Sequence, residues 1–207
     1  VNCIEDWGEK ISAIVDQTVD QNMTLISGIP PWVQMYFEKI IEKSGKKVGD
    51  VFKNFSLFIY GGVSFKPYKK IFDELIGRKI NSIEVYPASE GFFAFQDQIE
   101  DDSMLLILNN DIYYEFIKTK DLLNGKKNHI PLSEVEVGEN YALIISTSSG
   151  LWRYNIGDTI QFTETNPYRV IVTGRTKHFI SAFGEHVIAK EVESTIKEVS
   201  SKLKLRV

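Results

Sequence analysis

Three short stretches of the chain combine glycine with polar and charged residues where simple turns would need none of them. The first, EVYPASEGFFAF (84–95), places a tyrosine, a hydroxyl and a carboxylate between two apolar segments. The ring of Tyr86 offers a flat face for a base, the Ser89 hydroxyl can bond a phosphate oxygen, and the Glu90 carboxylate is the hard ligand that Mg²⁺ prefers. A turn with a solvated glutamate accounts for the same residues equally well.

The second stretch, LWRYNIGDTI (151–160), places an aspartate directly behind a glycine. Asp158 could accept hydrogen bonds from both ribose hydroxyls of a nucleotide, and Arg153 could reach an anionic substrate or form a surface pair. The alternative is an ordinary hairpin, because Gly-Asp is a common turn signal.

The third stretch, TGRTKHFISAFGEHV (173–187), places Arg175 and Lys177 beside a glycine, which indicates either a junction or a basic turn. Gly61-Gly62-Val63 forms a further candidate, because it follows an apolar strand. Ligands bind at the carboxyl ends of strands in open α/β sheets, where a missing Cβ lets a ligand approach the backbone. A strand-ending glycine pair is also simply a turn.

The elements that position these residues follow from periodicity. The first 91 residues alternate helical and strand patterns with few residues between them, which predicts a parallel α/β sheet. The first expected helix ends near Asp20, the second begins at Pro30-Pro31 and ends near Ser44-Gly45, and the third covers 68–75. The expected strands cover 23–29, 56–60 and 80–85. Strand 56–60 is continuously apolar, as a strand covered on both faces would be.

After Gly91 the pattern changes to short strands separated by turn residues, which predicts an antiparallel, barrel-like section. The expected strands are 92–95, 104–108, 112–117, 141–146, 159–162 and 168–172. From Val187 the apolar spacing becomes helical again. The fold class is therefore α/β: a parallel sheet with helices, then an antiparallel section, then the start of a small domain.

Composition excludes several classes of protein. The 207 residues are 43% hydrophobic and carry a net charge of -4 with interspersed signs, so a nucleic-acid-binding stripe is not expected. No apolar run approaches the roughly 18 residues of a membrane span, and Cys3 is the only cysteine, so a cytoplasmic protein without disulfides is expected. The start at Val1 indicates a piece of a longer protein.

Together, YPASEG, LWRYNIGD and GRTKHFISAFGEHV resemble the Gretchen Hagen family of auxin-responsive acyl acid amido synthetases, in its bacterial form, within the adenylate-forming superfamily. The resemblance implies that a carboxylic acid attacks the α-phosphate of ATP, and that an amino acid then displaces AMP from the acyl-adenylate. It implies a large adenylating domain in residues 1–172, and a hinge with the start of a C-terminal lid domain in residues 173–207. The implied partners are small molecules, with no nucleic acid and no membrane; the oligomeric state stays open.

The resemblance also implies a role for each candidate near the strand ends. Gly62 and Val63 would line the adenine slot, Tyr86 would lie against the adenine, and Ser89 would contact the α-phosphate.

The remaining roles concern metal, ribose and hinge. Glu90 would help to hold Mg²⁺, Asp158 would bind the ribose hydroxyls, and Arg175 would reach the ribose or phosphate. Glu90 and Arg175 are therefore the expected catalytic residues. Residues 173–177 would form the hinge.

The chain departs from the family pattern in three places. Residues 1–85 contain no Ser/Thr/Gly-rich phosphate loop, most of the lid is absent, and Asn155 stands where many relatives carry a basic residue. Positioning and electrostatics supply most of phosphate-transfer catalysis, so the chain alone is expected to be inactive. The alternatives are an acyl-CoA ligase, which uses another nucleophile, and a non-catalytic nucleotide-binding relative.

Overall fold

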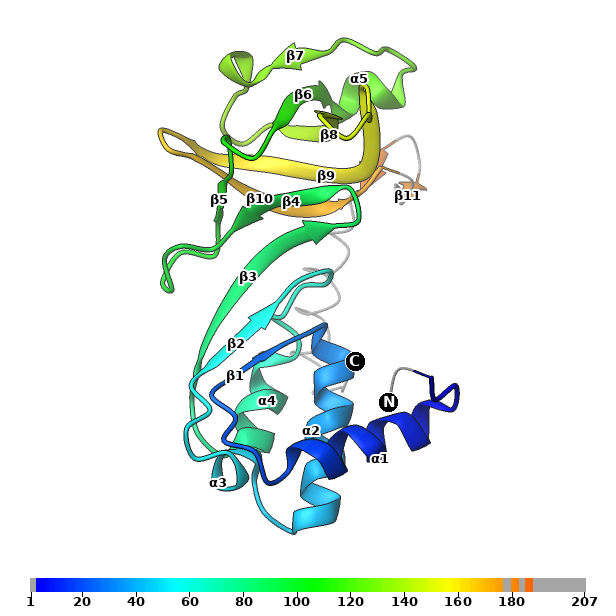
Figure 1. Cartoon of the computed structure of the whole chain (residues 1–207). Helices are drawn as coiled ribbons and strands as arrows, with labels where there is room; N and C mark the ends of the chain where they lie inside the picture. The colour runs from blue at the N-terminus through cyan, green and yellow to red at the C-terminus, as the bar shows by residue number, and fades with distance from the viewer. Residues whose placement is uncertain (1–2, 177–179, 183–184, 188–207) are drawn as a thin grey trace. The chain divides into compact units, whose positions relative to one another are not determined.

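The computed structural model describes residues 3–176, 180–182 and 185–187, with backbone alone after residue 176. The chain divides into two compact units of a mixed α/β fold, coloured along the chain in Figure 1. The first unit runs to Pro87 and includes Gln96–Glu100; the second includes Ala88–Phe95 and the chain from Asp101 onward. Strands pair in parallel in the first unit and antiparallel in the second.

Three parallel strands run through the first unit in the order β1, β2, β3. They cover Leu25–Ser27, Leu57–Tyr60 and Asn81–Ala88. Ile59 pairs with Ser27 on one side and with Ile83 on the other. The parallel sheet predicted from the strand-helix-strand order is confirmed.

Four helices accompany these strands: α1 (Trp7–Thr18), α2 (Pro30–Ser44), α3 (Val48–Val51) and α4 (Lys69–Ile76). The side chain of Asp6 caps α1 by accepting a hydrogen bond from the Glu9 amide at 2.8 Å. Helix α2 begins at Pro30 and ends at Gly45, whose φ of 67° is the left-handed conformation typical of a helix end. Proline and glycine therefore set the ends of α2 where the sequence predicts them.

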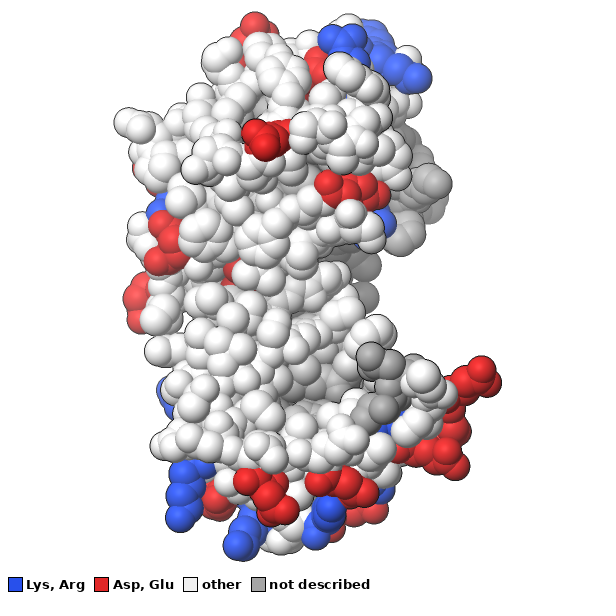
Figure 2. Space-filling model, viewed as in Figure 1, with Lys and Arg blue, Asp and Glu red and all other residues white. Residues whose placement is uncertain are grey.

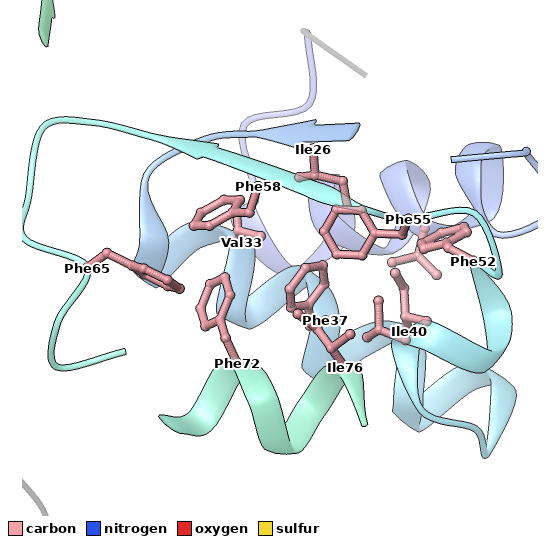
Figure 3. Close-up of a cluster of buried hydrophobic side chains, with 12 residues drawn as sticks. Ile26, Val33, Phe37, Ile40, Phe52, Phe55, Phe58, Phe65, Phe72 and Ile76 are labelled. Carbon is pink, nitrogen blue, oxygen red and sulfur yellow. The ribbon is translucent and has the colours of Figure 1, made fainter. Parts of the chain in front are cut away.

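The core of the first unit lies between these helices and one face of the strands. In Figure 3, Ile26 and Phe58 point from β1 and β2 toward Phe37 and Phe72 of α2 and α4. Phe58 is fully buried, but its neighbours Leu57 and Ile59 are only partly buried in the described structure. Because alternate side chains point to opposite faces, β2 is fully buried on the face of Phe58 and partly buried on the other face.

Seven antiparallel strands follow in the second unit, in the order β4-β5-β10-β9-β8-β6-β7. They cover Gly91–Phe95 (β4), Met104–Leu106 (β5), Ile112–Lys118 (β6), Ile130–Pro131 (β7), Asn140–Thr147 (β8), Tyr154–Thr165 (β9) and Tyr168–Arg175 (β10). Strands β4 and β7 end this order and do not pair with each other in the described chain. The antiparallel section is confirmed, as part of a sheet that is not closed.

Aromatic rings fill the centre of the second unit. Phe116, Tyr141 and Phe162, from β6, β8 and β9, are fully buried and meet edge to face, with ring centroids 5.2–6.0 Å apart. The short elements α5 (Thr119–Leu123) and a 3-10 turn (Leu132–Glu134) were not predicted from the sequence, and neither were α3 and β7. The backbone also shows a hairpin of β11 (Ile180–Ala182) and β12 (Glu185–Val187).

The predicted helix after Val187, and with it most of the predicted lid in 173–207, lies outside the described residues. Figure 2 shows Lys and Arg interspersed with Asp and Glu over the helices of the first unit, without a continuous basic stripe on that face. None of the helices in the described ranges is long and apolar enough to cross a membrane.

Candidate functional site

The connection between β3 and β4 carries the first candidate residues. Strand β3 continues to Ala88, Ser89 and Glu90 form a tight turn, and Gly91 begins β4. Ser89 is exposed and Glu90 is partly buried, whereas Tyr86 on β3 is only 7% exposed. Ser89 is therefore open to solvent and Glu90 partly so, while little of Tyr86 is available for contact.

Glu90 could take part in holding a metal only together with other ligands. Among the residues that the structure describes, no group of three or more His, Cys, Asp and Glu side chains is placed to hold a metal ion. In nucleotide sites, however, Mg²⁺ is held by one or two carboxylates together with substrate phosphates and water. A single carboxylate therefore fits a Mg²⁺ ion that arrives with a nucleotide.

Glycines after β2 allow a close approach of two backbones. A Cβ added at Gly61 would lie 2.5 Å from the carbonyl oxygen of Val85 on the neighbouring strand β3. Gly62 has a φ of 82°, a Cβ added there would make only an ordinary contact with Cγ1 of Ile29 at 3.9 Å, and Val63 is 41% exposed. The sequence singled out Gly61, Gly62 and Val63 together, and Gly61 is the position where the sheet itself requires glycine.

We expect Gly61→Ala to lower the free energy of unfolding by about 1–3 kcal/mol, because the added methyl group would separate β2 from β3. Gly62→Asn is the matched control, since asparagine tolerates a positive φ and its Cβ would make only an ordinary contact with Ile29; it should cost less than about 1 kcal/mol. Urea denaturation of both variants measures the difference. A larger loss for Gly62→Asn would contradict this interpretation.

Asp158 lies in an irregular part of β9 rather than in a turn. On β8, Ala142 pairs with Thr159 and Ile144 pairs with Asn155, so Ile156, Gly157 and Asp158 all lie opposite Leu143. The interpretation of Gly157-Asp158 as a hairpin is therefore wrong: it is a bulge within a strand. Bulges redirect a side chain and are often found next to active sites.

Local hydrogen bonds hold this bulge in place. The Gly157 amide, in a residue with a φ of 88°, donates to Oδ1 of Asn155 at 2.9 Å. The Gly157 carbonyl accepts from the Thr176 amide at 2.7 Å and from its hydroxyl at 3.2 Å. Asn155, singled out in the sequence only as a departure from relatives, is thus a structural part of the bulge.

The structure brings Asp158 and Arg175 together. They are paired residues on β9 and β10, and Nε of Arg175 lies 2.8 Å from Oδ1 of Asp158. The side chain of Asp158 is 12% exposed and that of Arg175 is 63% exposed. A largely buried carboxylate with an exposed cationic partner can accept hydrogen bonds from a diol while the arginine moves toward an anion.

Arg153 and Glu115 form a second ion pair, which the sequence indicated only in part. Nε of Arg153 donates to Oε2 of Glu115 on β6 at 3.0 Å, which confirms pairing as the use of Arg153. The Glu115 side chain is 9% exposed, so the partner is buried. The sequence feature that could have identified Glu115 is its position as a lone carboxylate in the apolar run YYEFI.

The candidates are divided between the two units. Gly62, Val63 and Tyr86 belong to the first unit, and Ser89, Glu90, Asp158 and Arg175 belong to the second. Among these candidates, the structure describes one contact between side chains, the ion pair of Asp158 and Arg175 in the second unit.

Comparison with known proteins adds sequence and fold similarity. Residues 105–175 match the GH3 family central domain. Indole-3-acetic acid-amido synthetase GH3.3 of Arabidopsis thaliana is 33% identical over 82 residues, which cover 38% of this chain and 14% of that protein. Jasmonoyl-L-amino acid synthetase JAR4 of Nicotiana attenuata is 30% identical over 120 residues, which cover 55% of this chain and 21% of that protein. The chain thus spans about one fifth or less of the length of these curated relatives.

Solved structures with the same fold include an amido synthetase and a CoA ligase. A GH3.15 acyl acid amido synthetase matches with a TM-score of 0.72 at 14% identity, covering 97% of this chain and 46% of that chain. An open conformation of 2-hydroxyisobutyryl-CoA ligase, in complex with 2-HIB-AMP and CoA, matches with a TM-score of 0.65 at 16% identity, covering 91% and 44%. The matched segment, residues 105–175, contains both Asp158 and Arg175. Residues 105–175 are therefore the part of the chain that is similar in sequence to the GH3 family central domain.

Proposed function

We propose that the protein containing this chain is an ATP-dependent acyl acid amido synthetase. In the first half-reaction, a carboxylate oxygen of the acid attacks the α-phosphorus of ATP, and pyrophosphate leaves. In the second, the amine nitrogen of an amino acid attacks the acyl carbon, loses a proton and releases AMP. The proposal rests above all on the buried carboxylate of Asp158, held in a strand bulge inside the matched GH3 segment.

The candidates of the second unit would bind the ribose, the phosphates and the metal ion. Asp158 would accept hydrogen bonds from the two ribose hydroxyls, and Arg175 would turn from Asp158 toward the ribose or phosphate. Ser89, exposed in its turn, would donate to the α-phosphate. Its neighbour Glu90 would bind Mg²⁺, which supplies charge neutralisation at the phosphates.

The adenine would lie against the end of β2 and β3. Gly62 leaves the backbone open, and Val63 offers an exposed apolar surface. Tyr86, largely buried, would contact the base through the part of its ring that stays accessible.

The domain assignment is part of the proposal. Residues 1–172 would belong to the large adenylating domain, 173–177 would be the hinge, and the chain to 207 would begin the lid. We propose that the chain alone is inactive, because its first 85 residues hold no Ser/Thr/Gly-rich phosphate loop. A cytoplasmic location and small-molecule partners complete the proposal.

An acyl-CoA ligase is the second candidate, because a CoA ligase shares this fold with a TM-score of 0.65. The two functions share the first half-reaction and differ in the nucleophile. The complete protein would be supplied with ATP, Mg²⁺ and a panel of carboxylic acids, with either amino acids or CoA. Amide formation without thioester would support the synthetase, and thioester formation without amide would overturn it. Nucleotide binding without either product would favour a non-catalytic relative.

We expect Glu90→Gln to raise the Mg²⁺ concentration needed for half-maximal activity by about tenfold or more, because a neutral amide is a poor ligand for a hard cation. A Mg²⁺ titration of pyrophosphate exchange measures this requirement. Glu100→Gln, at an exposed carboxylate of the first unit, should leave it unchanged. An unaltered titration for Glu90→Gln would make Glu90 a solvated turn residue.

A further inference from the structure

Glu115 is a charged residue inside an apolar strand. It lies on β6 between Tyr114 and Phe116, and only 7% of the residue is exposed. A buried carboxylate is costly unless it is paired and hydrogen-bonded. Its Oε2 accepts a hydrogen bond from Nε of Arg153 at 3.0 Å, and its Oε1 lies 3.8 Å from Nδ1 of His129. Both carboxylate oxygens therefore face nitrogen atoms, and the hydrogen-bonded partner is Arg153.

Arg153 lies where the chain enters β9. Its φ of 46° is an uncommon left-handed conformation for a residue with a side chain. Its amide donates to Oγ of Ser146 on β8 at 3.0 Å, while its guanidinium reaches Glu115 on β6. Arg153 thus joins the start of β9 to β8 and to β6.

The contact spans the intervening strand β8. Glu115 pairs with Ile144, and Ile144 pairs with Asn155, so β6, β8 and the start of β9 lie side by side at this level. The Glu115 side chain therefore reaches across β8 to a residue that immediately precedes β9. Removing the charge would release this end of the strand from β6.

Asp158 lies between two segments of β9 that are each paired with β8. On one side, Thr159 and Ile160 are buried and pair with Ala142 and Tyr141. On the other side, Tyr154 pairs with Ile145 immediately after the Arg153 anchor. Since the bulge holds extra residues, its shape depends on both registers; a slip on the Arg153 side would reorient the bulged residues.

We propose that Glu115 is a positioning residue for Asp158. Its buried carboxylate holds Arg153, and Arg153 fixes the entry of β9, so that the bulge presents the Asp158 carboxylate in one orientation. This inference rests on the proposed role of Asp158 as the ribose ligand. Glu115 itself does not contact the nucleotide in this arrangement.

The test compares Glu115→Gln with Glu136→Gln in the complete protein. Glu136 is a matched control, because it pairs with Lys118 of the same strand at 2.9 Å but is 65% exposed. The hydrogen-exchange rates of the amides of residues 154–158, measured without nucleotide, show whether Glu115 and Arg153 hold the start of β9. The Kd for ATP shows whether this affects nucleotide binding. We expect Glu115→Gln to raise both the exchange rate and the Kd for ATP by about tenfold, and to leave the KM for the acid unchanged. Glu136→Gln should resemble wild type in all three measurements.

A double-mutant cycle links the effect to the pair. Arg153→Gln should reproduce the loss, and the double variant should lose little more than either single variant. Arg153→Gln also serves if Glu115→Gln does not fold, because the Arg153 side chain is 68% exposed.

Different failures have different meanings. Unchanged exchange at 154–158 in Glu115→Gln would overturn the anchor. Faster exchange with an unchanged Kd for ATP would overturn its effect on the nucleotide site. A wild-type protein that binds no ATP would overturn the proposed function, and the exchange measurement would still decide whether Glu115 holds β9.

Discussion

The Asp158→Ala variant of the complete protein should lose carboxylate-dependent pyrophosphate exchange by about a hundred- to ten-thousandfold. The reason is that each of the two hydrogen bonds from the ribose hydroxyls to a carboxylate contributes about 1.5–3 kcal/mol. Stability should change little, because Arg175, the partner left behind, has a side chain that is 63% exposed and can be solvated. A thermal melt therefore separates loss of binding from loss of fold.

The control for this variant lies on the same strand. Glu164 also belongs to β9 and lies 3.5 Å from Arg169, but its side chain is 49% exposed. Glu164→Gln should exchange pyrophosphate like wild type. If Asp158→Ala also matched wild type in this exchange, the assignment of Asp158 to the ribose would be wrong. The segment 105–175 would then have no proposed contact with the ribose.

Phe58→Ala should lower the free energy of unfolding by about 3–5 kcal/mol, the usual cost of removing a buried aromatic ring. Phe58 is fully buried, and the rings of Phe65 and Phe72 lie 5.2 and 5.0 Å from it, centroid to centroid. In Figure 3 these side chains surround Phe58 from a loop and from α4. Stabilities of whole domains are about 5–15 kcal/mol, so this loss would leave a substantial unfolded fraction.

Urea denaturation followed by near-ultraviolet circular dichroism measures this loss. Phe92→Ala is the matched control: Phe92 is 44% exposed on β4, and its truncation should cost less than about 1 kcal/mol. Equal losses for the two variants would show that the aromatic cluster is not the stabilising core of the first unit.

Local signals were sufficient for the longer helices of the parallel part of the fold, although not for the short helix α3. Helix α2 illustrates this, because Pro30 begins it, Gly45 ends it, and Val33, Phe37 and Ile40 lie buried on the expected stripe. These features concern residues that are close in sequence, where spacing alone determines which face is buried. The observed helix, Pro30–Ser44, therefore begins at the predicted proline and ends where the sequence predicts, near Ser44-Gly45.

The bulge at Asp158 could not be derived in the same way. A hairpin turn and a bulge both favour glycine followed by a small polar residue, so GD is compatible with either. The distinction depends on which residues of β8 lie opposite, namely Ala142 and Ile144. That register is set by packing of the whole sheet and has no local signal.

The buried pair was missed for a related reason. Glu115 and Arg153 are 38 residues apart, and β8 lies between their strands. The sequence left two uses open for Arg153, because a side chain with this reach has many potential partners. A lone carboxylate within an apolar strand does, however, predict that some cation will be found for it.

The ion pair of Asp158 and Arg175 has a thermodynamic consequence for ligand entry. The carboxylate is already withdrawn from water and compensated by a guanidinium, with a separation of 2.8 Å. A ribose that binds to Asp158 would replace the guanidinium of Arg175 as its partner. The contribution of Asp158 to the binding free energy would therefore be the difference between its interaction with the ribose and its interaction with Arg175. Because most of the dehydration of Asp158 accompanies folding rather than binding, the nucleotide meets a carboxylate whose solvation changes little when it arrives.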